Sequence, residues 1–333
     1  MDKVAGLSPS QRAELFRQSA ERRGLRDAIV EKDFWVCWVL KKLFSDKTLQ
    51  NRLVFKGGTS LSKVYKLIDR FSEDVDLVLD WRLIGYGSDG EDPELPQLSK
   101  SKQDRFNVQM NAKAAEYIGG PLLLHLSAIF ASVSEIEVAV DPNDPHCVDV
   151  RYPAVFKAGY LLPQVRLEIG PLASWVPSAP YSIQPYASED FPQVFEDPVC
   201  PVTAIAAERT FWEKTTILHK EAHRASVIPA RYSRHYYDLF RLAESPIRAA
   251  ALADLKLLEA VVAFKSQFYP SAWARYDLAR PGTFRLLPKQ DQVGMLEKDY
   301  REMAAMLFGD IPDFKVILQV LSTLESEINQ LKP

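Results

Sequence analysis

The fold is decided by two neighbouring stretches of sequence, Lys56-Gly57-Gly58-Thr59-Ser60-Leu61 and Arg70-Phe71-Ser72-Glu73-Asp74-Val75-Asp76-Leu77. The first stretch follows a short apolar run and leads into apolar residues at helical spacing. It therefore predicts a strand, a glycine turn and a helix that continues to about Asp69. The second stretch predicts a strand over residues 74–80, because polar and apolar residues alternate in it.

The glycine turn has the composition of a phosphate-binding turn. Gly57 and Gly58 let backbone N–H groups approach a bulky anion, and Thr59 or Ser60 can donate a hydroxyl hydrogen bond. Together with Lys56, these residues are the candidate nucleotide-binding set. A Gly-Gly pair before a helix is also ordinary turn chemistry, so the turn alone does not establish a site.

Two carboxylates in the second strand form the candidate catalytic pair. Asp74 and Asp76 project from the same face of a strand, roughly 6.5–7 Å apart. This spacing lets both converge on two divalent cations about 3.5–4 Å apart. The polar solvent face of an edge strand is the alternative. The upstream glycine turn favours the metal site, because a divalent cation would also bridge nucleotide phosphates.

Glu168 is a candidate third carboxylate. It shares the polar face of a predicted strand, residues 164–169, with Arg166. On a strand next to the two aspartates, Glu168 would bind metal or accept the proton of an attacking hydroxyl. An exposed ion pair between Arg166 and Glu168 remains an open alternative.

Composition narrows the class of protein. The chain has 333 residues, 47% hydrophobic and 26% charged, which predicts one large or two linked globular domains. A net charge of −3 argues against a generally basic nucleic-acid coat. The three cysteines are widely spaced, and no apolar run approaches the roughly 20 residues that span a bilayer. We expect a cytoplasmic protein with no membrane contact.

The order of predicted elements indicates an α+β fold with N-terminal helices and a C-terminal helical bundle. We predict N-terminal helices in residues 1–50, an α+β core in 51–185 and a helical domain in 186–333. Besides the strands above, we predict strands at 122–128, 135–140 and 147–151, giving a mixed sheet, and a long loop at 83–104. A proline-rich connector, residues 177–201, should end the sheet. Helices are then expected at 201–223, 230–245, 249–266, 292–307 and 312–330.

Residues 209–241 carry a local excess of positive charge. Lys and Arg outnumber Asp and Glu there, which suits nucleotide phosphates or a nucleic-acid backbone. A solvated helix with i,i+4 ion pairs is the alternative. His219 and His223 have the spacing of a zinc pair, but Lys220 stands where the HExxH motif needs glutamate, so zinc is disfavoured.

The chain resembles the AbiEii/AbiGii toxin family of nucleotidyltransferases, found in abortive-infection and type IV toxin–antitoxin modules. The resemblance rests on the two stretches quoted first and on three further blocks in this order: Glu31-Lys32-Asp33-Phe34-Trp35, Arg209-Thr210-Phe211-Trp212-Glu213-Lys214 and Arg234-His235-Tyr236-Tyr237-Asp238-Leu239. It implies a DNA-polymerase-β-like nucleotidyltransferase core with a helical C-terminal part.

The same resemblance implies roles for single residues. Gly58 and Ser60, or Thr59 in place of Ser60, would hold the triphosphate, and Asp74 with Asp76 would bind Mg²⁺. Two further residues are implied in catalysis: Lys214 would contact phosphate, and Asp238 would be a late acidic residue needed for activity.

The expected activity is transfer of a nucleoside monophosphate from an NTP to RNA, in particular to the 3′ end of tRNA, by a phage-defence toxin whose antitoxin is encoded nearby. Two alternatives stay open: transfer to a protein hydroxyl, as in AMPylation, and a non-catalytic module that binds nucleotide or RNA.

Overall fold

The computed structural model describes residues 1–72, 74–87, 98–157 and 161–332. The chain divides into two compact units. The first contains Met1–Val64 and Ser72–Ile205, and the second contains Tyr65–Phe71 and Ala206–Pro333. Each unit is described by itself.

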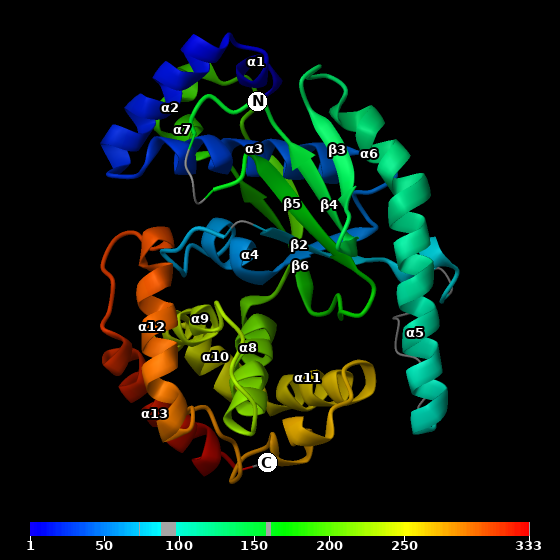
Figure 1. Cartoon of the computed structure of the whole chain (residues 1–333), viewed down its shortest axis with the longest axis vertical. Helices are drawn as coiled ribbons and strands as arrows, with labels where there is room; N and C mark the ends of the chain where they lie inside the picture. Colours follow the sequence, from blue (N-terminus) through cyan, green and yellow to red (C-terminus); the bar gives the residue numbers. More distant parts are fainter. Residues whose placement is uncertain (73, 88–97, 158–160, 333) are drawn as a thin grey trace. The chain divides into compact units, whose positions relative to one another are not determined.

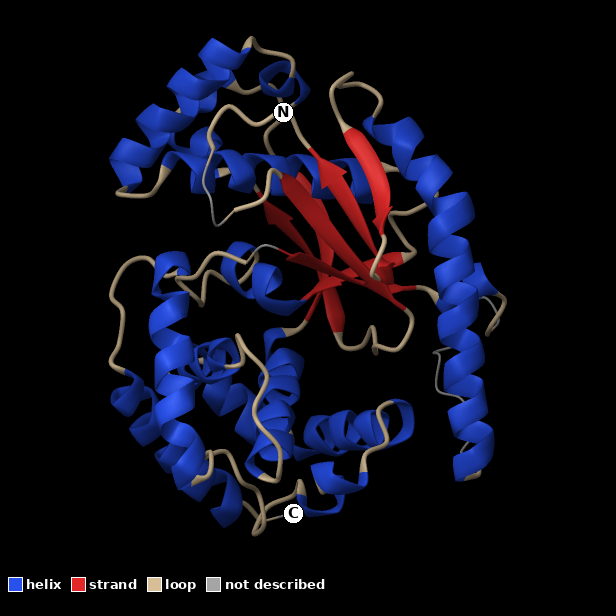
Figure 2. Cartoon of the chain, in the orientation of Figure 1, coloured by secondary structure: helices blue, strands red, loops and turns tan. Residues whose placement is uncertain are grey.

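A mixed sheet of seven strands organises the first unit. Figure 2 shows its strands in red. Its strands are β1 (Leu53–Lys56), β2 (Asp74–Leu79), β3 (Glu137–Asp141), β4 (Asp144–Arg151), β5 (Gln164–Gly170), β6 (Ser178–Ile183) and β7 (Cys200–Ile205). They lie in the order β3-β4-β5-β2-β1-β7-β6. β2 pairs parallel to β5 and antiparallel to β1, while β1 pairs parallel to β7. The predicted α+β class with a mixed sheet is confirmed.

Helices cover the sheet because their apolar residues need burial. The helices of this unit are α1 (Asp2–Ala5), α2 (Pro9–Arg23), α3 (Asp27–Ser45), α4 (Gly57–Lys63), α5 (Lys100–Tyr117), α6 (Leu123–Phe130) and α7 (Tyr186–Asp190). A capping box between Ser8 and Gln11 begins α2. Helix α3 packs on β7 and β5 (Figure 1). It buries Phe34, Trp35 and Trp38 almost completely.

The predicted strand at 122–128 is wrong. A π-helical turn, Ile118–Leu122, joins α5 to α6, and the three form one continuous helical stretch that packs along β3 and β4 (Figure 1). The Leu-rich run has no clear period, and a short apolar run fits a buried helix as well as a strand. Of the predicted 83–104 loop, residues 88–97 lie outside the described residues, and residues 100–104 already belong to α5.

The proline-rich stretch does not end the sheet, because β6 and β7 lie within or just beyond it. Pro180 sits in β6, which is the edge strand, where a missing N–H costs no ladder hydrogen bond. Pro201 lies outside the part of β7 that pairs with β1, which is limited to Ala204 opposite Phe55. Helix α4 also ends at Lys63, before the predicted Asp69.

The second unit is helical. It contains α8 (Ala207–Ala222), α9 (Ser233–Ala243), α10 (Ile247–Ala253), α11 (Leu255–Phe268), α12 (Val293–Met303) and α13 (Phe314–Gln330). The predicted 249–266 helix is divided, since Asp254 caps α11 by accepting the Leu257 N–H. The 65–71 segment is tied in by hydrogen bonds from Phe71 N to Met306 O (2.8 Å) and from Phe308 N to Asp69 O (2.9 Å).

Candidate active site

The glycine turn between β1 and α4 is built directly against one of the predicted carboxylates. Lys56 lies opposite Asp76 in the antiparallel register of β1 and β2. Gly57, the next residue, has φ of +79°, and a Cβ placed on it would lie 1.8 Å from Asp76 Oδ2 and 3.0 Å from Asp76 Cβ. Only glycine allows this backbone conformation and this close approach together. The turn and the Asp74–Asp76 strand are therefore one structural element.

The hydroxyl groups of the turn bind protein atoms. Thr59 Oγ1 donates a hydrogen bond to the carbonyl oxygen of Asp74, and Ser60 Oγ donates one to the carbonyl oxygen of Gly57 (2.9 Å). Both side chains are buried. Thr59 fixes the turn to β2 and Ser60 bonds within the turn, so a bound phosphate would meet the backbone of the turn.

Three carboxylates share one face of the sheet. Asp74 and Asp76 are half-buried on β2, and Glu168 lies directly opposite Asp76 on the parallel strand β5. Such register partners on adjacent strands have backbones about 4.8 Å apart. Arg166, opposite Asp74, pairs with Asp149 (2.9 Å) and with Asp141. The structure thus places Glu168, the candidate third carboxylate, on the same face of the sheet as Asp74 and Asp76.

A divalent cation fits this donor set with help from substrate. Among the described residues, no three His, Cys, Asp or Glu side chains are grouped closely enough to hold a metal ion by themselves. Mg²⁺ is usually held by one or two carboxylates, waters and substrate phosphates, and a dedicated protein cage is unusual. Asp74 and Asp76 beside the glycine turn fit that requirement, if substrate phosphates supply the remaining oxygens.

In the second unit, Asp238 is the centre of a buried ion-pair cluster. Both of its oxygens accept from Arg70, with Nε–Oδ1 at 2.6 Å and the second contact at 2.9 Å, and Lys214 Nζ lies 2.8 Å from Oδ2. Asp238 is 0% exposed. Burial alone would raise the pKa of Asp238, but Arg70 and Lys214 together hold it below its ordinary value.

Lys214 also contacts His235, which identifies the protonation state of that imidazole. Lys214 Nζ lies 3.2 Å from His235 Nδ1. Burial, and then the charge of Lys214, lowers the pKa of His235 well below its ordinary value, so the ring is neutral and Nδ1 accepts from the ammonium. Burial also lowers the pKa of Lys214, although Asp238 opposes this shift.

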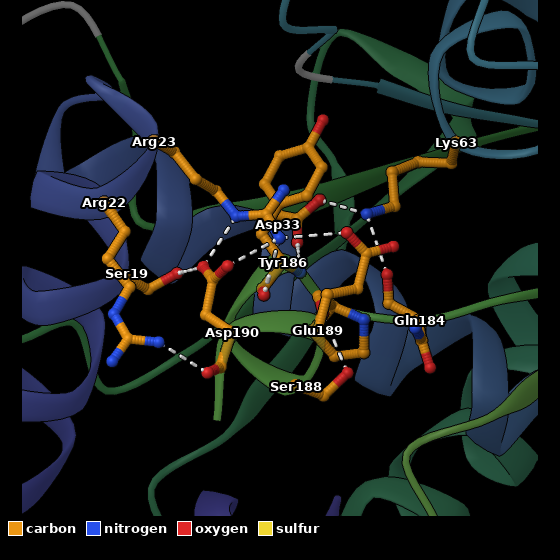
Figure 3. A network of polar contacts seen from close by, with 11 residues as sticks. Ser19, Arg22, Arg23, Asp33, Lys63, Gln184, Tyr186, Ser188, Glu189 and Asp190 are labelled. Carbon is orange, nitrogen blue, oxygen red and sulfur yellow. Dashed lines mark hydrogen bonds and ion pairs between the residues drawn. The ribbon is translucent and has the colours of Figure 1, made fainter. Parts of the chain in front are cut away.

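A second buried ion pair supports α4, the helix that follows the glycine turn. Lys63 Nζ donates to Asp33 Oδ1 (2.6 Å) and to the carbonyl oxygen of Gln184 (3.0 Å), and it lies 4.0 Å from the ring centroid of Tyr186. Asp33 Oδ2 accepts the backbone N–H of Tyr186 (2.7 Å). Figure 3 shows how these groups join α3, α4 and α7, with Arg23 extending the network to Asp190.

Removal of Lys63 should destabilise the first unit. Lys63→Met leaves the Asp33 carboxylate buried without its cation, at a cost of about 3 kcal/mol. Burial already raises the pKa of Asp33, and protonation of that carboxyl limits the cost. Urea unfolding and hydrogen exchange of α3 and α7 amides measure the loss. Lys3→Met, which breaks the exposed pair with Glu196, is the control and should unfold like the parent. The double variant Asp33→Leu/Lys63→Met should be more stable than Lys63→Met, and equal or lower stability would contradict the assignment.

His219, one of the two histidines with zinc spacing, is held by other contacts. His219 Nδ1 accepts the backbone N–H of Arg285 (3.1 Å), and its Nε2 lies 3.0 Å from the carbonyl oxygen of Arg275. Burial lowers the pKa of His219 to about 4, so the ring is neutral at pH 7. Both nitrogens of His219 are thus engaged within the protein.

Three residues of these networks were assigned no role from the sequence. Arg70 begins the stretch that contains Asp74 and Asp76, but its partner Asp238 is far away along the chain. Asp33 and Lys63 each carried a usable signal, since a charged residue inside an otherwise apolar helical face implies a buried partner. Nothing local in the sequence identifies that partner.

Known proteins that are similar to this chain are nucleotidyltransferase toxins. The family model described as nucleotidyl transferase AbiEii toxin, type IV TA system, matches residues 38–320. Among solved structures, the chain is similar to MenT4, a nucleotidyltransferase toxin from Mycobacterium tuberculosis H37Rv, at 20% identity and a TM-score of 0.42, with 98% of this chain and 100% of that chain covered. No curated protein matches the chain.

Within the part of the chain that the structure describes, no helix is both long and apolar enough to span a membrane. The matched range covers most of the sequence, and the residues of the glycine turn, the paired aspartates and the Asp238 cluster lie within it. The resemblance and the enzyme class predicted from sequence are confirmed: the chain belongs to the AbiEii family of nucleotidyltransferases, the toxins of type IV toxin–antitoxin systems.

Proposed function

We propose that this toxin transfers a nucleoside monophosphate from an NTP to an RNA acceptor, the 3′ end of tRNA, in a Mg²⁺-dependent reaction. The single observation that carries the proposal is the contact between Gly57 and the Asp76 carboxylate, because it joins a phosphate-accepting turn to a metal-binding pair.

The first unit supplies the groups that hold the NTP. Backbone N–H groups at Gly57 and Gly58 face the triphosphate, and Lys56 offsets its charge. Thr59 and Ser60 keep the turn in place through their bonds to Asp74 and Gly57. Asp74 and Asp76 bind the divalent cations, and Glu168 is the adjacent carboxylate that completes the metal site or accepts the proton of the attacking hydroxyl.

When bound, two Mg²⁺ ions supply activation of the acceptor hydroxyl and neutralisation of the departing pyrophosphate. Lys214 contacts phosphate in this proposal. Asp238 is fully buried between two cations, so we assign it the role of positioning Lys214 and Arg70. In the cell, we propose a cytoplasmic enzyme that acts in phage defence and whose antitoxin is encoded nearby.

Loss of Asp74 should abolish most of the transfer. Metal placement that supplies roughly 3–5 kcal/mol of transition-state stabilisation predicts a rate lower by about 10²–10³-fold in Asp74→Ala. The assay incubates the parent and the variant with each of four α-labelled NTPs and whole-cell extract, with Mg²⁺ or with EDTA. Incorporation by Asp74→Ala at the parent rate would remove the assignment.

Fractionation of the labelled products identifies the acceptor. Label in tRNA supports the proposal, whereas label in protein supports transfer to a protein hydroxyl. A module that only binds nucleotide or RNA would protect RNA but release no pyrophosphate.

A further inference from the structure

A basic surface surrounds an exposed tryptophan in the second unit, at the C-terminal end of α8. We call it the Trp273 patch and define it by these residues: Lys220, Arg224, Trp273, Arg275, Arg285 and Lys289. The Trp273 side chain is 39% exposed, a large exposed fraction for this residue type. Lys220 Nζ lies 5.0 Å and Arg224 Cζ 4.5 Å from the centroid of its ring.

Contacts around His219 of α8 and around His223, the residue that follows this helix, bring the other cations to the same place. Lys289 Nζ donates to the carbonyl oxygen of Arg224 (2.7 Å). The backbones of Arg275 and Arg285 both bond to the His219 ring, which lies 4.8 Å from the ring of His223. Burial, and then the charges of Arg285, Arg275 and Lys289, lowers the pKa of His223. Cations from three separate segments of the chain therefore converge.

Internal ion pairs neutralise only part of this charge. Glu221 pairs with Arg224 (2.5 Å), and Asp277 pairs with Arg275 (3.0 Å). Within the described ranges, Lys220, Arg285 and Lys289 have no carboxylate partner. An excess of exposed cations in a protein of net charge −3 needs an anionic partner or solvent to balance it.

The combination of cations and an exposed indole fits RNA. We propose that the Trp273 patch binds the acceptor RNA, with Arg285 and Lys289 on backbone phosphates and an unpaired base stacked on Trp273. An acidic protein would use the cations but has no need of the ring, whereas stacking on an aromatic side chain is the usual way to hold an unpaired base. This inference rests on the proposed function, because it places the RNA on which that function acts.

Direct binding of full-length protein to labelled total tRNA tests the patch. Arg285→Ala/Lys289→Ala should weaken binding at least tenfold and reduce the slope of log Kd against log salt by about 2. The matched control is Lys298→Ala/Arg301→Ala, which removes two exposed cations of α12 and should bind like the parent. Trp273→Ala should weaken binding about tenfold, and Trp273→Phe should restore most of it.

Kinetics separate this inference from the proposed function. The double patch variant should raise KM for RNA and leave kcat and KM for the NTP unchanged. If the parent transfers label to tRNA while the patch variants bind tRNA like the parent, the patch is excluded and the proposed function stands. If the parent binds tRNA through the patch but transfers label to protein, the proposed RNA acceptor is wrong, and the assignment of the patch as an RNA-binding surface is supported.

Two further results would overturn the patch. Equal loss of tRNA and poly-L-glutamate binding in the double variant, with no effect of Trp273→Ala, would mark a general anion surface or a protein-docking site. Circular dichroism verifies that each variant is folded. Lys220→Gln provides an independent variant with a native-like backbone, and a tRNA affinity equal to that of the parent in this variant and in Trp273→Ala would exclude the patch.

Discussion

Gly57→Ala should lower nucleotidyl transfer by about 10³-fold or more, although it changes a residue with no functional group. The new Cβ would lie 1.8 Å from Asp76 Oδ2, 2.6 Å from Cγ and 3.0 Å from Cβ of the same residue. A rotation of the carboxylate does not relieve the contact with Asp76 Cβ, whose position the β2 backbone fixes. Asp76 and the turn must therefore move apart, which disturbs the proposed metal-binding and phosphate-binding groups together.

Backbone strain alone is a smaller effect, and Gly85→Ala controls for it. Gly85 has φ of +82°, nearly that of Gly57, but its added Cβ would meet only Lys113 Nζ at 3.9 Å. Backbone strain costs about 1–2 kcal/mol of stability in both substitutions, the clash with Asp76 adds to it only in Gly57→Ala, and only Gly57→Ala should lose activity. The comparison uses label transfer at matched concentrations of folded protein. Parallel losses of activity in the two variants would contradict the proposed role of the contact.

Local signals in the sequence predict the strand and the glycine turn that carry the candidate site residues. The strand with Asp74 and Asp76 alternates with period two, and the glycine turn lies between a strand and a helix, so both are encoded by residues close along the chain. The pairing of Glu168 with Asp76 follows from the same alternation in β5, once the two strands are adjacent. Which strands are adjacent is a tertiary property, and the sequence suggested it without fixing it.

Where tertiary packing decides, the sequence misled. Residues 122–128 are apolar enough for a strand, but they continue the helical stretch that begins in α5, through the π-helical turn Ile118–Leu122 into α6. Prolines between 177 and 201 suggested a connector, yet an edge position lets Pro180 remain within β6. The two buried cation partners of Asp238, Arg70 and Lys214, are likewise set by tertiary packing, and the sequence does not identify these pairs.

Asp238→Ala should destabilise the second unit by about 5 kcal/mol. The substitution leaves the Arg70 guanidinium and the Lys214 ammonium buried without a counter-charge, and an uncompensated buried charge costs several kcal/mol. Asp238→Asn keeps the shape and some hydrogen bonds but loses the charge, so its cost should be about 3 kcal/mol. Asp277→Ala removes a carboxylate from an exposed pair with Arg275 and should unfold like the parent.

Hydrogen exchange of amides in α8 and α9 measures this loss where it occurs, since Lys214 and Asp238 lie in these helices. A carboxylate that acted only in catalysis would lower turnover in Asp238→Ala and leave exchange in both helices unchanged. If Asp238 is a positioning residue, Asp238→Ala instead accelerates exchange in both helices to the extent set by the full loss of stability. The double variant Arg70→Met/Asp238→Leu should then recover part of the protection against exchange without recovering activity. Unchanged exchange in Asp238→Ala would return Asp238 to a direct catalytic role, because stability and turnover would then be separate properties of this carboxylate.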